Sequence, residues 1–159
     1  MSQPIALRLV EPADLDHFFA HQNDPVARRM AAFTSADPAD RAGFDAHWAR
    51  ILADPAIVIR TVVHETVVVG QVLAFEQFGE REISYWIARP HWGRGIATQA
   101  LRQFLAALSL RPLHARAAAD NAASIRVLQK CGFVAYRAER GFAPARGAEI
   151  DEVVLRLDV

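Results

Sequence analysis

A glycine-rich turn stands between a predicted strand and a predicted helix near the middle of the sequence. The strand covers Glu82 to Ala88, and Pro90 ends it. The turn contains Gly93 and Gly95. The helix after it carries apolar residues at helical spacing: Ala97, Leu101, Phe104, Leu105 and Leu108. A strand followed by a glycine-rich turn and an amphipathic helix favours a fold in which helices pack on a sheet.

Further strands and helices are predicted on both sides of this junction. Strands are expected over 5–10, in a hairpin within 57–78, over 113–119, and in a last pair over 133–139 and 149–157. One helix follows the first strand, a second begins at Asp37-Pro38, and another covers 121–132, while 23–33 is predicted as a loop. This order predicts an α+β fold in a single domain, 1–159, with a mixed central sheet and helices on both faces.

Composition limits the partners and the location. Lysine plus arginine number 18, as do aspartate plus glutamate, so neither nucleic acid nor an anionic membrane is expected as a partner. Cys131 is the single cysteine, which excludes an intrachain disulfide and favours a reducing compartment. No signal peptide and no apolar run of about 20 residues is found, so a cytoplasmic location is expected. The histidines form no H-E-x-x-H motif, and no metal ion is predicted.

The glycine-rich turn has the properties of an anion site. A helix N-terminus leaves unpaired N–H groups and carries partial positive charge, and glycine lets a phosphate approach the backbone. The groups predicted to face phosphate oxygens are the backbone N–H groups of Gly93, Arg94, Gly95, Ile96, Ala97 and Thr98, with the Arg94 side chain as a mobile cation. The alternative is an ordinary tight turn. No P-loop lysine follows, and Thr98 stands where a dinucleotide fingerprint needs glycine, so neither NTP nor NAD is favoured.

Two segments together resemble the cofactor motifs of the GNAT superfamily of acetyl-CoA-dependent N-acetyltransferases. Trp92, Gly95 and Ala97 fall at the fixed positions of [QR]-x-x-G-x-[GA], with Trp92 replacing the glutamine or arginine. The second motif is matched by Asn121, Ser124, Gly132 and Phe133. Both features resemble the branch of ribosomal-protein N-terminal (RimJ/RimL-like) acetyltransferases. The predicted element order is similar to that fold over essentially the whole chain.

This resemblance implies where coenzyme A lies. Its pyrophosphate would rest on the N–H groups of residues 93–98. Its pantetheine arm would lie between the fourth and fifth strands, which splay apart and leave backbone groups near Trp86 and Ile87 free to hydrogen-bond it. Asn121 would bond the arm from the other side, although asparagine at a helix start also serves as an N-cap without any ligand.

Amine acetylation requires an unprotonated amine, which decides the importance of a base. Freeing the lone pair at pH 7 costs about 4.6 kcal/mol for a lysine-like amine and about 1 kcal/mol for an α-amine. Glu82 is similarly placed to the general base of several GNAT enzymes, and the alternative is a charged strand end that faces solvent. Glu76, at the end of the neighbouring strand, is the reserve candidate.

The carbonyl and the leaving thiolate need hydrogen-bond donors. A backbone N–H near Ile87 is expected to polarise the carbonyl. Many GNAT members place a tyrosine seven residues after the asparagine, but this chain has Leu128 there. Ser124 is the matching donor in the ribosomal branch, while helix-start hydrogen bonding is its alternative role; Tyr85 and Tyr136 are other candidates.

The sequence leaves the acceptor open among a protein N-terminus, a small amine, an amino acid and an antibiotic. The expected acceptor site comprises Ala27–Phe33, the second helix and the last hairpin. A degenerate acyl-CoA-binding regulatory or scaffold module is the alternative to an enzyme, and a domain that binds only proteins is a third. Family members are often dimers, so a homodimer is one expected state.

Overall fold

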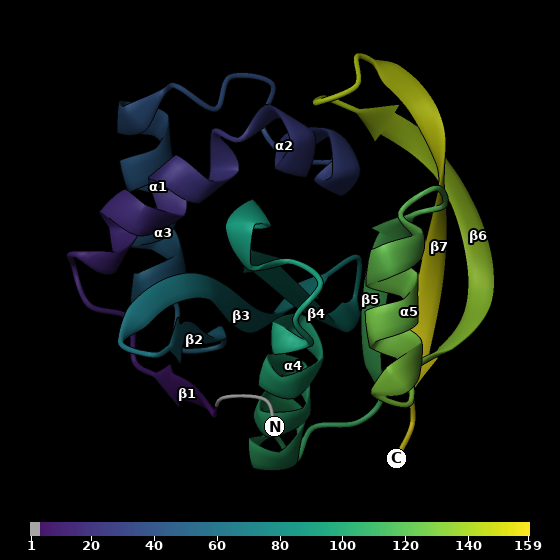
Figure 1. The fold of residues 1–159 in the computed structure, drawn as a ribbon. Helices are drawn as coiled ribbons and strands as arrows, with labels where there is room; N and C mark the ends of the chain where they lie inside the picture. The colour runs from purple at the N-terminus through teal and green to yellow at the C-terminus, as the bar shows by residue number, and fades with distance from the viewer. Residues whose placement is uncertain (1–3) are drawn as a thin grey trace.

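The computed structural model describes residues 4–159, which form one seven-stranded sheet flanked by helices (Figure 1). The strands are β1 (Ile5–Arg8), β2 (Val58–His64), β3 (Val67–Gln77), β4 (Glu80–Ile87), β5 (Leu113–Ala118), β6 (Val134–Ala143) and β7 (Ala148–Leu157). Their order in the sheet is β1-β2-β3-β4-β5-β7-β6. The predicted fold class, a mixed sheet in an α+β chain, is confirmed.

The sheet separates along one line. Within the described chain, β4 and β5 form the one parallel pair, and they are bridged only at Glu82 and His114. By contrast, β3 and β4 pair along eight residues, and β5 and β7 pair along six. The remaining length of β4 and β5 therefore diverges, as predicted for the fourth and fifth strands.

Helices cover both faces of the sheet. They are α1 (Asp14–Gln22), α2 (Pro25–Ala31), α3 (Arg41–Ala53), α4 (Ile96–Ala107) and α5 (Ala122–Lys130), with a 3₁₀ turn, η1 (Arg89–His91). On one face α4 and α5 pack on the main core, which includes Leu101 and Leu128. On the other face Phe18 of α1 and Trp48 of α3 pack on Ile59 of β2. The arrangement puts β4 between the two groups of helices (Figure 1).

Two local predictions were wrong. The segment 23–33 is not a loop, because Asp24 accepts hydrogen bonds from the N–H groups of Val26 and Ala27 and Pro25 occupies the first turn of α2. The same Asp-Pro signal misled the prediction at Asp37-Pro38. There α3 begins later, with Asp40 as N-cap.

Alternation along β4 decides which side chains reach which face. Ile83 and Ile87 are buried in the core beneath α4, with Tyr85 packed against them. Glu82, Ser84 and Trp86 therefore point to the face covered by α1, α2 and α3. A cavity between β4 and β5 has access to both sets of residues.

Candidate active site

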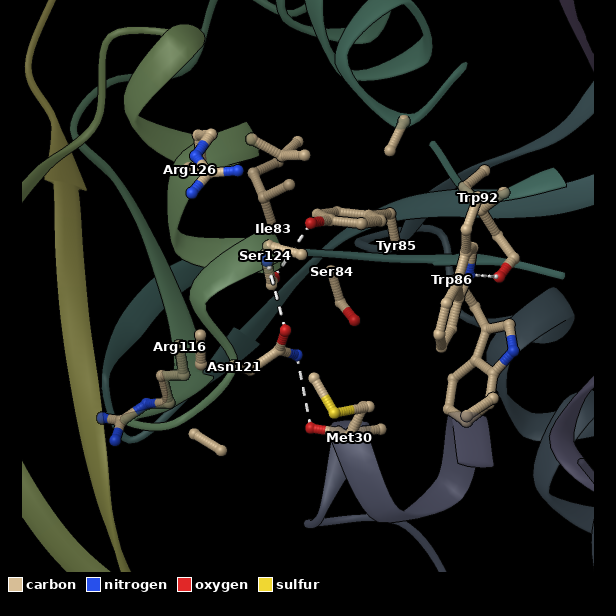
Figure 2. Close-up of a pocket in the computed structure, with 18 of the residues that line it drawn as sticks. Met30, Ile83, Ser84, Tyr85, Trp86, Trp92, Arg116, Asn121, Ser124 and Arg126 are labelled. Atoms are coloured by element: carbon tan, nitrogen blue, oxygen red, sulfur yellow. Dashed lines mark hydrogen bonds between the residues drawn. The ribbon is translucent and has the colours of Figure 1, made fainter. Parts of the chain in front are cut away.

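A cavity of about 630 Å³ occupies the region where β4 and β5 separate. Its walls come from the N-terminus of α4, the length of β4, one side of α5 and the segment around α2. Figure 2 shows Tyr85 and Ser124 meeting on one side, with Met30 of α2 on the other. A volume of this size is typical of small-molecule sites.

The N-terminus of α4 is built from bare backbone. Gly95 is its N-cap with φ 75° and ψ 10°, Gly93 has φ 76°, and no side chain caps the helix. The N–H of Gln99 makes the first helical bond, to the Gly95 carbonyl, so the preceding N–H groups of the first turn lack helical partners. A Cβ at either glycine would meet no atom within 4 Å. The turn is therefore an open cradle that fits an anion.

The backbone of Ile87 is oriented by its neighbours. The N–H of Ala88 donates to the Val69 carbonyl on β3 (2.8 Å), so the N–H and carbonyl of Ile87 face the opposite side, toward β5. The Trp92 indole N–H donates to the Ile87 carbonyl (2.7 Å; Figure 2). Trp92 thus ties the glycine turn to the end of β4, and the Ile87 N–H faces the gap.

Asn121 has two structural partners. Its Oδ1 accepts from the Ser124 N–H (3.2 Å), and its Nδ2 donates to the Met30 carbonyl (3.2 Å; Figure 2). The predicted N-cap role is therefore present, and the second bond joins α5 to α2 across the cavity. Asn121 also lines the cavity, so a contact with the pantetheine arm stays a prediction.

Ser124 meets a tyrosine from β4. The Tyr85 hydroxyl and Ser124 Oγ lie 2.9 Å apart, and both residues line the cavity. Burial raises the pKa of Tyr85 to about 12, so its hydroxyl keeps its proton at neutral pH. Leu128, at the position of the usual tyrosine, is 2% exposed and belongs to the core. Tyr136 lies on β6, 44% exposed, and does not line the cavity.

Glu82 is buried, 3% exposed, and lines the cavity. The alternative of a strand end facing solvent is therefore wrong. Its Oε2 accepts from Arg116 Nε (3.0 Å), and the same guanidinium donates to Glu139 (2.8 Å) and Glu152 (2.9 Å). Burial raises the pKa of Glu82, while the hydrogen bond and charge of Arg116 oppose that rise. Glu76 is exposed and does not line this cavity.

The sequence analysis missed Arg116. The signal was available, because Arg116 is the one arginine within a strand of alanines, "HARAAA", and a charge in a central strand needs buried partners. The carboxylates that partner it come from β4, β6 and β7, which no local pattern brings together.

One wall of the cavity is formed by α2 and the residues after it. This wall includes Ala27, Met30, Phe33 and Thr34, so part of the segment 27–33 lines the cavity, and its contact with an acceptor stays a prediction. The described residues of α3 and of the β6–β7 turn do not line it, so those parts of the predicted acceptor site are not brought to this cavity. Arg126 and Lys130 of α5 add positive charge to its wall.

Residues 4–159 contain neither a cluster of metal-binding side chains nor a helix that could span a membrane. His17 and His21 lie one turn apart on α1, but no group of three or more histidine, cysteine or acidic side chains is placed to hold a metal ion. None of the described helices combines the length and the hydropathy that crossing a bilayer requires.

The sequence profile of the acetyltransferase (GNAT) domain family matches residues 5–134, most of the chain. The chain belongs to this family. The resemblance stated from the motifs is confirmed, and acetyl-CoA, the predicted cofactor, is the acetyl donor of the family. The open cradle at Gly93 and Gly95 is compatible with the phosphates of that molecule.

Three proteins similar to this GNAT chain are each less than 30% identical to it. The uncharacterized N-acetyltransferase p20 of Bacillus licheniformis is 29% identical over 86 residues, 52% of this chain and 48% of the relative, so the match spans about half of that protein. The microcin C7 self-immunity acetyltransferase MccE, solved with acetyl-CoA and AMP, has a TM-score of 0.79 at 16% identity over 98% of this chain and 92% of its own. RimJ of Mycobacterium smegmatis, solved with CoA-disulfide, has a TM-score of 0.77 at 18% identity over 98% and 82%. These structures support the fold. RimJ, from the ribosomal branch, is one of several GNAT proteins with a similar structure.

Proposed function

We propose that the chain is an acetyl-CoA-dependent N-acetyltransferase that moves the acetyl group to a primary amine by direct attack in a ternary complex. The observation that carries this proposal is a single cavity that joins the uncapped N-terminus of α4 to the buried carboxylate of Glu82 and the hydroxyl of Ser124. Direct attack needs both substrates in one space, and this cavity is lined by residues from both faces of β4.

Acetyl-CoA supplies an activated acetyl group as a thioester. The N–H groups of residues 93–98 would hold its pyrophosphate, because they lie at the positive end of a 12-residue helix with open space before them. Arg126 and Lys130 add cations to the cavity wall, whereas Arg94 is exposed on the turn and does not line the cavity. Asn121 and the Ile87 N–H would hold the pantetheine arm and the carbonyl, since both border the gap between β4 and β5.

Glu82 is the proposed base. Its raised pKa, which burial causes, makes it a better proton acceptor than an exposed glutamate. Arg116 favours the ionised form of Glu82 and fixes the position of its carboxylate. The proton would pass from the amine to Glu82 directly or through a water. Ser124, at the other wall, would donate a hydrogen bond to the departing sulfur.

The acceptor is proposed to be a protein N-terminus or a small-molecule amine. It would enter past Met30 and Thr34, on the α2 side of the cavity. A degenerate acyl-CoA-binding module is the competing function, favoured by Leu128 at the usual tyrosine position. A cytoplasmic location and a homodimer stay predictions.

Thiol release from acetyl-CoA, measured with a panel of peptides and small amines, tests the proposal. We expect turnover with at least one class of amine, and mass spectrometry of the products identifies it. CoA binding without turnover on any amine supports the binding module. CoA at 100 times a micromolar Kd should stabilise the protein by about 2.7 kcal/mol. If no thermal stabilisation is seen, both the enzyme and the binding module are contradicted.

A further inference from the structure

Tyr85 and Ser124 form a hydroxyl pair across the opening between β4 and α5. Their oxygens are 2.9 Å apart, within the cavity that also contains Glu82 and the N-terminus of α4. Figure 2 shows the Tyr85 ring reaching from β4 to the first turn of α5. A bond between two hydroxyls consumes one of their two hydrogens, so the pair retains one O–H donor.

Either oxygen can donate in this bond, and the acidity of the two hydroxyls decides which arrangement is favoured. A phenol is a stronger acid than an aliphatic alcohol, so the Tyr85 hydroxyl is the better donor of the two and Ser124 Oγ the better acceptor. Burial holds the Tyr85 hydroxyl in its protonated form at neutral pH. In the favoured arrangement Ser124 accepts from Tyr85, and the O–H of Ser124 is free to point into the cavity.

The position of Ser124 favours an anion beside it. It lies in the first turn of α5, and Asn121 Oδ1 already bonds its backbone N–H. A negative charge near that turn gains from the positive end of the helix. Leu128, by contrast, is buried in the core and offers no donor.

We infer that Tyr85 is a positioning residue, which holds Ser124 so that its hydroxyl stabilises the leaving thiolate of coenzyme A. The inference rests on the proposed acetyl transfer. In that reaction the amine nitrogen forms a bond to the acetyl carbon and loses a proton to Glu82 or water. The carbon–sulfur bond breaks, its electron pair goes to sulfur, and the Ser124 O–H hydrogen-bonds the thiolate, which later takes a proton from solvent.

The direct test measures the pKa of the CoA thiol bound to the enzyme, by the ultraviolet absorbance of the thiolate during a pH titration. It requires no acceptor. In the wild type we expect a pKa about 1–2 units below the free thiol value near 8.5, the effect of one hydrogen bond to a charged group. Ser124→Ala and Tyr85→Phe should each remove most of that shift, while the affinity for CoA with a protonated thiol, measured at about pH 6, stays within about threefold. Tyr136→Phe, which removes an exposed hydroxyl bonded to Arg137, should leave the shift intact.

Kinetics give the second readout. We expect Tyr85→Phe to lower kcat about 10- to 100-fold with the KM for acetyl-CoA unchanged, and the double variant with Ser124→Ala to be no slower than Ser124→Ala alone. Equal thiol pKa values in the wild type and both variants would overturn the inference, as would additive losses in kcat. A wild type that does not bind CoA refutes the proposed function, and the inference with it.

Discussion

Replacing Gly95 with aspartate tests the phosphate cradle with a matched control elsewhere in the chain. Gly95 and Gly79 share the same φ of 75°, and a Cβ at either position would meet no atom within 4 Å. Gly79 lies in the turn between β3 and β4 and does not line the cavity. Both Gly→Asp variants therefore carry the same backbone strain, about 1–2 kcal/mol, and the same added charge.

The charge introduced by Gly95→Asp should stabilise the protein slightly in the absence of ligand but should weaken the binding of CoA. In the absence of ligand, the carboxylate at Gly95 gains about 0.3–1 kcal/mol from the positive end of α4, so Gly95→Asp should be no less stable than Gly79→Asp. When CoA is present, a carboxylate about 4 Å from a phosphate charge costs about 4 kcal/mol at an effective dielectric constant of 20. That corresponds to about a 1000-fold loss of affinity.

Calorimetry and thermal unfolding with CoA measure both quantities. At 100 times Kd, the wild type should gain about 2.7 kcal/mol, or about 5–11 °C for a domain of this size. Gly79→Asp should keep that gain, whereas Gly95→Asp should show none at the same concentration. If Gly95→Asp binds CoA within about threefold of the wild type, or if both variants lose binding equally, the cradle is not at the N-terminus of α4.

Two further predictions concern buried carboxylates. Glu82→Gln should lower turnover about 10²- to 10⁴-fold on alkyl amines and less on α-amines, because α-amines have a lower pKa and depend less on a base. The variant should still fold, because Arg116 keeps its hydrogen bonds to two other carboxylates. Glu76→Gln, an exposed change on the next strand, is the control, and equal losses on both amine classes would contradict the role of Glu82 as base. Burial alone raises the pKa of Asp14, but hydrogen bonds from Arg8 and two other donors outweigh it and set the pKa at about 2, below the ordinary 3.8. The contribution of Asp14 to the free energy of unfolding is therefore complete above about pH 4 and should fall by about 2 kcal/mol as the pH drops through 2. Asp14→Asn should abolish this part of the pH dependence of stability in denaturant titrations. Identical pH profiles for the wild type and Asp14→Asn would refute this role of Asp14.

Helices with strong local signals were predictable. The apolar spacing after the glycine turn predicted α4, and its buried residues include Leu101, Phe104 and Leu105, as expected. Asn121 was predicted as a helix start and is the N-cap of α5. Caps and amphipathic spacing act within one or two turns of chain, so the sequence carries them directly.

Ambiguous capping signals produced the errors. The chain has Asp-Pro at positions 24–25, 37–38 and 54–55, and only the first begins a helix. The three dipeptides are chemically the same. The outcome depends on what the following residues bury: Ala27 of α2 is enclosed, whereas α3 first buries Phe44, seven residues after Asp37.

The sequence by itself determined the family, the fold class and the backbone chemistry of the glycine turn, because these depend on short motifs and on periodic apolar residues. Only the tertiary structure decided the state of the side chains in the cavity. It put Glu82 beside Arg116, whose other hydrogen-bonded carboxylates come from β6 and β7, and it brought Tyr85 to Ser124, 39 residues away along the chain. Burial and long-range pairing set the pKa and the orientation of such groups, and both arise only when distant segments pack together.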